Sequence, residues 1–224
     1  MKKILFTKEL DKHWLKENLT GKLDFEVCPV LKIEVYPTEK FTLKINPNSS
    51  RFIISSQNAV KSISDLDLKG AFFVVGEKTA QKLIENGLNV VHFEDYASEL
   101  ADYILKNFQA ENWNFFCGNN RRETLFEKLI PNGHTLNEII CYESIPINYR
   151  IGYDAYDAVV FFSPLAVKTY FSNNSIPESS IIFSIGNTTT EEVKNYTKNK
   201  IITAEIPLLE MVIEKINSYY DTEK

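Results

Sequence analysis

The sequence predicts an α/β protein of two lobes, each built around a parallel sheet. Short apolar runs alternate with helical patterns along the chain, which is typical of parallel strands covered by helices on both faces. The segment "FFVVGEKTAQKL" at 72–83 is echoed by "IFSIGNTTTEEV" at 182–193, and the pattern Ser-x-x-Ala-Val-Lys begins at Ser56 and again at Ser163. A repeat of this length indicates a duplicated domain, and a chain of 224 residues has room for two domains.

The predicted strands are short, apolar on both faces and rich in β-branched or aromatic residues, as buried parallel strands are. Helical patterns follow most of them. In 98–108 and in 121–130 the apolar residues recur at the spacing that places them on one stripe of a helix. We expect strands at Ile4–Thr7, Ile53–Ser55, Phe72–Val75, Val90–Phe93, Asn114–Cys117, Ile139–Cys141, Val159–Phe162, Ile181–Ile185 and Ile201–Thr203.

Two segments have the polar and proline breaks expected of linkers, one around Pro37 and one around Pro146. If the chain crosses between lobes at both, the first lobe is built from the two ends of the chain and the second from its middle. A tandem split near residue 110 fits the repeat equally well. The pattern of residues leaves both arrangements open.

Composition and charge exclude several classes of function. The net charge of −5 argues against nucleic acid as a partner, while leaving a small anionic ligand possible. No window approaches the length of apolar sequence that spans a membrane, and the apolar run near the N-terminus is too short for a signal peptide. We therefore expect a cytoplasmic protein with no membrane or nucleic-acid partner.

Cofactor and metal motifs are also missing from the sequence. The three cysteines, Cys28, Cys117 and Cys141, are odd in number and show no C-x-x-C spacing, so we expect buried reduced thiols. The three histidines do not form an H-x-x-x-H pattern, and neither glycine-rich nucleotide motif occurs. The sequence predicts no metal site and no cofactor. No carboxylate pair, Ser–His–Asp or Cys–His arrangement stands out, so the chemistry needs no strong nucleophile.

Five turns between a predicted strand and the next helix carry Ser, Thr, Asn or Gly. Ligands of parallel α/β sheets bind beyond the carboxyl ends of the strands, where N–H groups suit carboxylates or phosphates. The alternative is that these residues only cap helices, and that Lys78, Arg121 and Arg122 lie on solvated helix faces. If the turns face a shared cleft, the candidate binding residues are Ser56, Gln57, Asn58, Gly76, Lys78, Thr79, Gly118, Asn119, Arg121, Arg122, Ser163, Leu165, Gly186, Thr188 and Thr189.

The turns, in this order, resemble those of the uroporphyrinogen-III synthase family. Its T-S-P-x-A-V looks like "SPLAV" and "SSQNAV", its V-G-x-x-T-A like "VVGEKTA", and its A-I-G-P-T-T-A like "FSIGNTTTEEV". Its CGN-x-x-R-E-x-L and Y-[EQ] segments look like "CGNNRRETL" and "CYESIPI", and its A-E-x-P-T like "TAEIPLL". The chain departs from these patterns at Gln57, Asn187, Thr190 and Leu208, which leaves open a homologue that binds a ligand without catalysis.

The resemblance implies a fold and settles the order of the segments. Members of the family have two flavodoxin-like lobes, each with a parallel five-stranded sheet flanked by helices, joined by a short two-strand linker. On this chain the implied first lobe is discontinuous, at 1–32 and 152–224. The implied second lobe is 37–146, with linkers at 33–36 and 147–151.

The resemblance also implies a reaction in tetrapyrrole and haem biosynthesis. Hydroxymethylbilane, a linear tetrapyrrole with eight carboxylates, loses water to give an azafulvene, and attack through a spiro intermediate inverts ring D to form uroporphyrinogen III. No cofactor takes part, and a monomer is expected. Tyr142 looks like the family's cleft tyrosine, whose phenol would donate a proton to the departing hydroxyl. The alternatives are a core or linker role for Tyr142, and a non-catalytic two-lobe binding protein for a polyanionic small molecule.

Overall fold

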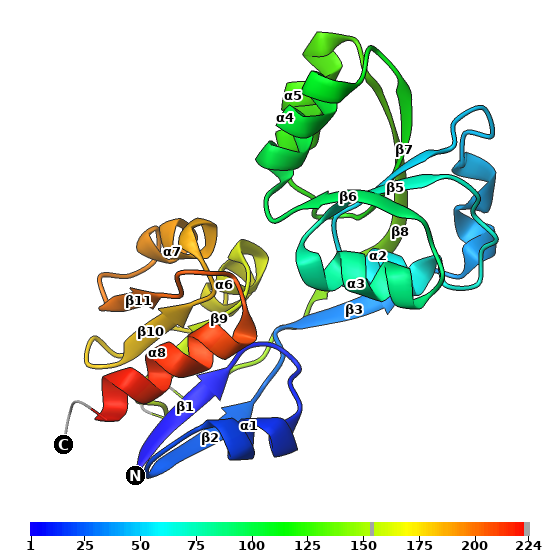
Figure 1. Cartoon of the computed structure of the whole chain (residues 1–224). Coiled ribbons are helices and arrows are strands. Elements are labelled where there is room, and N and C mark those ends of the chain that lie inside the picture. The colour runs from blue at the N-terminus through cyan, green and yellow to red at the C-terminus, as the bar shows by residue number, and fades with distance from the viewer. Residues whose placement is uncertain (153–154, 222–224) are drawn as a thin grey trace. The chain divides into compact units, whose positions relative to one another are not determined.

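The chain folds into two compact units, each with its own sheet and helices (Figure 1). In this computed structural model, residues 1–152 and 155–221 are described. One unit comprises Met1–Lys32 and Ile145–Lys224, and the other comprises Ile33–Ser144. Each contains a sheet of parallel strands with helices on both faces, which confirms the predicted α/β class. None of the helices in the described ranges is both long and apolar enough to cross a membrane.

The unit that contains both chain ends has a five-stranded sheet in the order β11-β10-β9-β1-β2, and its strand pairs are parallel. Alternate residues of a strand face opposite sides, so β1 sends Ile4 and Phe6 toward α1 and α8, and Leu5 toward α6 and α7. The elements are β1 (Lys2–Phe6), α1 (Lys12–Asn18), β2 (Leu23–Val27), β9 (Ala158–Phe161), α6 (Pro164–Phe171), β10 (Ile181–Ser184), α7 (Asn187–Lys194), β11 (Ile201–Thr203) and α8 (Leu209–Asp221).

The unit of Ile33–Ser144 follows the same plan. In β4, Phe52 and Ile54 pack against α2 and α3, while Ile53 packs on the opposite face against α4 and α5. The elements are β3 (Leu31–Val35), the 3₁₀ turns η1 (Thr38–Lys40) and η2 (Thr42–Lys44), β4 (Arg51–Ile54), α2 (Gln57–Ser62), β5 (Ala71–Val75), α3 (Glu77–Glu85), β6 (Val90–Glu94), α4 (Ala97–Asn107), β7 (Asn112–Gly118), α5 (Thr124–Leu129), η3 (Ile130–Asn132) and β8 (Thr135–Pro146).

The second sheet has six strands in the order β3-β8-β7-β4-β5-β6, so the expectation of five strands is wrong here. The extra strand is β3, which lies beside the long strand β8. Tyr36 donates its backbone N–H to the Cys141 carbonyl at 3.0 Å, and Ile147 donates to the Val30 carbonyl at 2.8 Å. From Val30 to Tyr36 the residue numbers increase, while their partners on the β8 side decrease from Ile147 to Cys141, so β3 runs antiparallel to β8. β3 thereby covers an edge of the sheet that the parallel strands would leave open.

Every strand predicted from the sequence is present, with ends that differ by a few residues. The helix expected at 98–108 is α4. The helix expected at 121–130 begins later, at Thr124, so Arg121 and Arg122 lie in the preceding turn and not on the helix. Cys117 and Cys141 are buried free thiols as predicted, whereas Cys28 is only half-buried.

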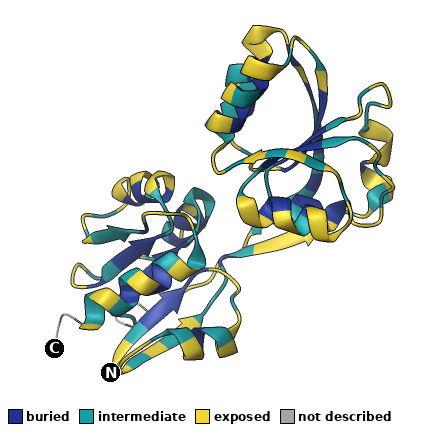
Figure 2. Ribbon diagram, viewed as in Figure 1, coloured by how far each residue is buried: buried dark blue, intermediate teal, exposed yellow. Residues whose placement is uncertain are grey.

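The repeated segments adopt the same sequence of buried and exposed positions (Figure 2). Residues 71–80 and 181–190 share one pattern, in which the strand is buried, the turn is half-buried, the first two helical residues are exposed and the next two are buried. Since β5 and β10 carry different residues, the shared pattern reflects equivalent places in the two sheets.

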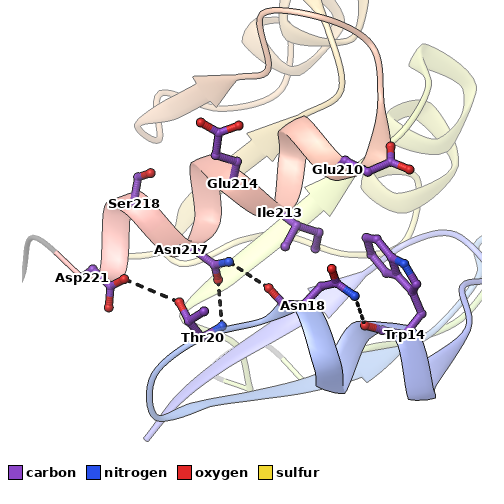
Figure 3. A pocket seen from close by; sticks show the side chains of 9 residues that line it. All are labelled: Trp14, Asn18, Thr20, Glu210, Ile213, Glu214, Asn217, Ser218 and Asp221. Carbon is purple, nitrogen blue, oxygen red and sulfur yellow. Dashed lines mark hydrogen bonds between the residues drawn. The ribbon is translucent and has the colours of Figure 1, made fainter.

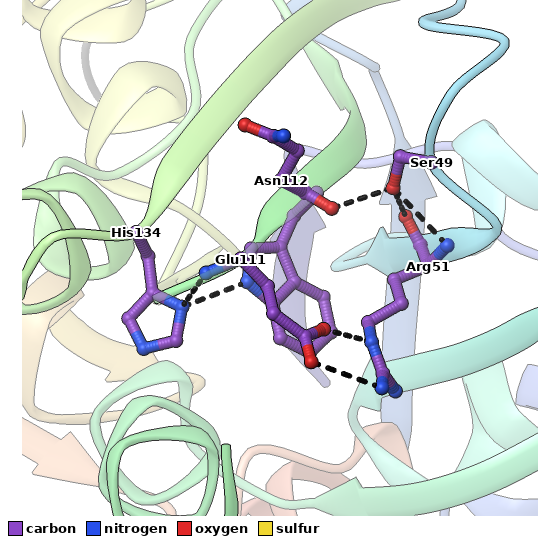
Figure 4. Close-up of polar contacts among 6 residues, drawn as sticks. Ser49, Arg51, Glu111, Asn112 and His134 are labelled. Atoms are coloured by element: carbon purple, nitrogen blue, oxygen red, sulfur yellow. Dashed lines mark hydrogen bonds and ion pairs between the residues drawn. The ribbon is translucent and has the colours of Figure 1, made fainter. Parts of the chain in front are cut away.

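A polar cluster holds the amino ends of β4 and β7 together (Figure 4). Arg51 at the start of β4 pairs with Glu111, with 3.1 Å between Arg51 Nη2 and Glu111 Oε1. The buried His134 ring accepts at Nδ1 from Trp113 Nε1 at 3.1 Å and from the Glu111 backbone N–H at 3.3 Å. These contacts fix the edge of the sheet opposite to the strand-end turns, and we assign them a structural role.

Candidate functional site

The sheet order brings the predicted turns together within each unit. β7, β4 and β5 are neighbours, and their pairs are parallel, so the turns that follow them lie at one edge of the sheet. In the other unit β9 and β10 are parallel neighbours, so their turns are adjacent as well. Ligands of such sheets bind at this edge, and the turns therefore define the candidate site in each unit.

Ser56 and Ser163, at matching places in the repeat, both cap helices. The Ser56 hydroxyl accepts from the Asn58 backbone N–H at 3.1 Å, and the Ser163 hydroxyl accepts from the Ala166 N–H at 3.1 Å. The expectation that these turns cap helices is confirmed for both serines. Capping uses one acceptor site of each hydroxyl and leaves its proton for another partner.

The two matching glycines differ in why they are needed. Gly76 has a φ of 92°, a conformation that residues with a side chain rarely adopt. Gly186 has a φ of 171°, which is extended backbone open to any residue, and a β-carbon there would come no closer than 3.9 Å to Pro207. A tight turn explains the glycine at 76 and does not explain the one at 186.

The two matching threonines lie in the first turns of α3 and α7. Thr79 and Thr189 are 6% and 1% exposed, and their backbone N–H groups bond to the carbonyls of Gly76 and Gly186 at 3.0 and 3.1 Å. Their side chains therefore shape the turns and present almost no surface to a ligand. Other predicted residues are exposed at the same turns: Gln57, Lys78, Asn119, Arg122 and Thr188. Asn58 and Leu165 are half-buried.

Gly118, the last residue of β7, lies against Tyr142 of β8. The register of β7 and β8 shifts between Cys117 and Gly118, so that Gly118 lies opposite Tyr142 and Cys141 is the extra residue of a bulge. A β-carbon on Gly118 would lie 2.4 Å from Cζ of the Tyr142 ring, so only glycine admits the ring here. The phenol oxygen lies close to the Gly118 backbone as well, since the same β-carbon would lie 2.8 Å from it.

The electrostatics keep the half-buried Tyr142 phenol protonated. Burial raises its pKa, and this effect outweighs the lowering contributions of Ser56 and Gly118. A tyrosine already ionises only near pH 10 in water, so at neutral pH the group is a neutral proton donor. The half-buried ring leaves part of its surface accessible.

Asn119 fixes the backbone on either side of this tyrosine. Its N–H donates to the Tyr142 carbonyl at 3.3 Å, and its side-chain oxygen accepts from the Ser144 N–H at 2.9 Å. Its side-chain nitrogen donates to the Glu143 carboxylate at 3.3 Å, which also accepts from the Tyr36 hydroxyl at 3.0 Å. The hydrogen bond to Glu143 raises the pKa of Tyr36. The turn after β7 is thereby tied to β8 at three consecutive residues.

Arg121 is already occupied by carboxylates of its own chain. Its guanidinium pairs with Glu138 on β8 and, at 2.6 Å, with Glu123, and it lies 3.8 Å above the Phe126 ring. Analysis of the sequence missed both Glu138 and Glu143. Each is a carboxylate within a largely apolar strand. Such a carboxylate predicts a cationic or hydrogen-bonding partner, because burying an unpaired charge is costly.

A groove between α1 and α8 is separate from these turns (Figure 3). It has a volume of 340 Å³ and is bounded by Trp14, Ile213 and three carboxylates, those of Glu210, Glu214 and Asp221. Asn217 ties its walls by accepting from the Thr20 N–H at 3.0 Å and donating to the Asn18 carbonyl at 2.8 Å. Because its charged groups are acidic, the groove does not suit an anionic ligand.

The turns of the unit Ile33–Ser144 offer hydroxyls, amides, backbone N–H groups and the cations Lys78 and Arg122, together with one protonated phenol. Such groups orient an anionic substrate and transfer a proton, and they form no covalent intermediate. The chain is thus a two-unit α/β protein in which polar turns follow the carboxyl ends of the parallel strands of each unit. The match of residues 21–214 to the model of "Uroporphyrinogen-III synthase HemD" shows that the chain belongs to the uroporphyrinogen-III synthase family.

Solved structures share the fold at low sequence identity. A mutant uroporphyrinogen III synthase of Thermus thermophilus is 14% identical, with all of both chains covered and a TM-score of 0.71. The uroporphyrinogen-III synthetase of Helicobacter pylori 26695 is 17% identical, with 98% of this chain and all of that chain covered and a TM-score of 0.69. The "Uncharacterized protein RP474" of Rickettsia prowazekii (strain Madrid E) is 24% identical over 98% of this chain and 76% of its own length.

Proposed function

We propose that this chain closes hydroxymethylbilane to uroporphyrinogen III with loss of one water and inversion of ring D. Membership of the uroporphyrinogen-III synthase family makes it an enzyme of tetrapyrrole biosynthesis. The single observation on the chain itself that supports this activity is the half-buried, protonated Tyr142 phenol, whose ring lies against Gly118. The proposal requires no metal and no cofactor.

The reaction begins when the C–O bond of the substrate's hydroxymethyl group breaks. The oxygen leaves as water, taking a proton from Tyr142, and the electrons of the pyrrole nitrogen stabilise the azafulvenium cation that results. Attack by the substituted carbon of ring D forms a carbon–carbon bond in a spiro intermediate, whose fragmentation and reclosure invert that ring. Loss of a proton restores the aromatic pyrrole, and that proton balances the one that Tyr142 gave.

Positioning supplies the rest of the catalysis, because the substrate eliminates water and cyclises unaided. Holding one folded conformation removes the entropic cost of bringing the two ends of the tetrapyrrole together. We assign the exposed residues Gln57, Lys78, Asn119, Arg122 and Thr188 to the substrate's carboxylates. Gly76, Thr79, Gly186 and Thr189 shape the turns that carry them, Ser163 and Leu165 belong to the turn after β9, and Asn58 lies in the first turn of α2.

Product analysis tests the function. The purified chain is mixed with hydroxymethylbilane, the products are oxidised, and the porphyrin isomers are separated. Type III product in excess over a boiled control supports the proposal. Type I product alone, which is the isomer formed spontaneously, supports a protein that binds a polyanionic ligand without catalysis.

A further inference from the structure

The place of the Tyr142 ring depends on the bulge in β8. Along this strand Ile140 packs on the face of the sheet that α4 and α5 cover, and Cys141 packs on the face that α2 and α3 cover. Regular alternation would return Tyr142 to the first face, but it packs against the same cluster as Cys141. The break coincides with the shift of register at Gly118. Without the bulge, the ring would therefore lie on the opposite face of the sheet.

Ser62, the last residue of α2, holds the bulge through a buried hydrogen bond. Its side chain is 3% exposed, and its hydroxyl donates to the Cys141 carbonyl at 2.9 Å. The same carbonyl oxygen accepts from the backbone N–H of Tyr36, just after β3, at 3.0 Å. The carbonyl of the bulge residue is thus fixed by two donors from different elements of the unit.

Ser62 also has a partner within its own helix. Its hydroxyl lies 2.9 Å from the Asn58 carbonyl, four residues earlier, a bond that serines in helices commonly make. Because a hydroxyl carries a single proton, the two carbonyls share it. The bond within α2 does not depend on β8, whereas the bond to Cys141 joins residues 79 positions apart and requires the bulge.

The residues around Tyr142 transmit the position of the bulge to the ring. The Tyr142 carbonyl accepts from the Asn119 N–H at 3.3 Å. The ring lies against Gly118, where a β-carbon would approach Cζ to 2.4 Å, so there is no space for the ring to move closer to β7. Release of the Cys141 carbonyl would therefore let the ring move away from Gly118.

We infer that Ser62 is a positioning residue for proton donation by Tyr142, because its hydroxyl holds the bulge that places the ring on the α2 face beside Gly118. The inference rests on the proposed function and deepens it. A side chain that is 3% exposed offers almost no surface to a substrate, so Ser62 acts through Cys141 and Tyr142. Its loss should change kcat and leave KM nearly unchanged.

A double-mutant cycle tests the assignment. Ser62→Ala should fold, because alanine favours a helix and the Cys141 carbonyl keeps its hydrogen bond from Tyr36. We expect its kcat to fall about tenfold, close to the loss from Tyr142→Phe, since the proton donor is displaced. In a Tyr142→Phe background the same change should lower kcat no further, because the phenol through which Ser62 acts is absent.

Ser180→Ala is the matched control for loss of a buried hydroxyl. Ser180 is also 3% exposed and donates to the Tyr156 carbonyl at 2.8 Å, directly before β10 in the other unit. We expect wild-type kcat from this variant. Unchanged kcat in Ser62→Ala, an equal loss in both backgrounds, or a rise in KM alone would overturn the inference.

A second readout does not depend on turnover. With labelled tyrosine and glycine, nuclear Overhauser effects report the contact between the Tyr142 ring and the α-protons of Gly118, and the ring signals are assigned by their absence from Tyr142→Phe. These effects should be strong in wild type and in Ser180→Ala, and weak in Ser62→Ala. Undiminished effects in Ser62→Ala would contradict the inference. A chain that makes no type III product removes the proposed function, and this readout then still decides whether Ser62 holds the ring.

Discussion

The Tyr142 ring lies directly over Gly118, and a β-carbon on Gly118 would approach Cζ of that ring to 2.4 Å. Gly118→Ala should therefore push the ring out of its place beside Ser56. We expect turnover to fall by about tenfold or more, as for loss of a placed proton donor. Gly152→Ala is the control, because its β-carbon would lie 3.6 Å from Ala155, an ordinary contact. Equal activity in the two variants would show that the position of the ring does not matter.

Tyr142→Phe and Tyr142→Ala separate catalysis from packing. The Phe variant should lose about tenfold or more in kcat, less than many proton donors because the substrate cyclises unaided. Its stability should fall by about 1 kcal/mol, since the partners of the phenol lose one hydrogen bond. The Ala variant should lose about 3 kcal/mol through the missing ring. The measurements are turnover and the thermal midpoint; unchanged turnover in the Phe variant removes Tyr142 from the reaction.

The pH dependence of kcat gives an independent check on the same residue. Burial raises the pKa of Tyr142 above its ordinary value near 10. The phenol is then protonated throughout the neutral range, and its contribution to turnover should be lost only as the pH rises through that elevated pKa. The advantage of wild type over Tyr142→Phe should therefore be constant across neutral pH. An advantage that disappears below pH 9 would contradict a phenol donor.

Arg121 and Arg122 should differ although they are adjacent. Arg121 pairs with Glu138 and Glu123, so Arg121→Gln should destabilise the protein by about 1–3 kcal/mol through the carboxylates left behind. Adding Glu138→Gln should recover part of that loss. The exposed Arg122 should act on the substrate, so Arg122→Gln should raise KM and weaken its salt dependence. The reverse pattern would exchange the roles of the two residues.

His134 should make stability sensitive to acid. Its buried Nδ1 accepts two hydrogen bonds, and burial lowers its pKa below 6.5. Because the unfolded chain binds the proton more tightly, the contribution of His134 is complete above about pH 6.5 and is lost as the pH falls through the lowered value. The His134→Gln variant should show a shallower loss of unfolding free energy between pH 7 and pH 5. Equal slopes in urea titrations would contradict this account.

The fold was largely predictable because apolar runs and helical stripes determine which segments are strands and which are helices. β3 was expected only as a strand of the linker that the family resemblance implies at 33–36, and its place as a sixth strand of the second sheet was not predicted. The start of α5 was misplaced because the charged residues after β7 fit a helical pattern equally well. The structure begins the helix at Thr124, and Arg121 ahead of it pairs with Glu123 and Glu138.

The candidate site was predictable at the level of turns and not at the level of contacts. Ser and Gly after a strand indicate where a ligand edge lies, so Ser56 and Gly118 were singled out, while Tyr142 was singled out by the family resemblance. Their meeting depends on the neighbouring positions of β4, β7 and β8 and on the bulge at Cys141, which leaves no mark in the residue pattern. The burial of Thr189 was equally hidden, because a threonine near a helix start fits a lining role and a packing role alike.

The central claim is that the chain turns over hydroxymethylbilane to the type III isomer. The most direct measurement mixes a small amount of chain with a large excess of fresh hydroxymethylbilane and counts molecules of uroporphyrinogen III per chain. We expect many molecules of type III product per chain, at a rate proportional to the protein concentration and sharply reduced in Tyr142→Phe. A yield that never exceeds one molecule per chain, or type I product alone, would contradict the claim.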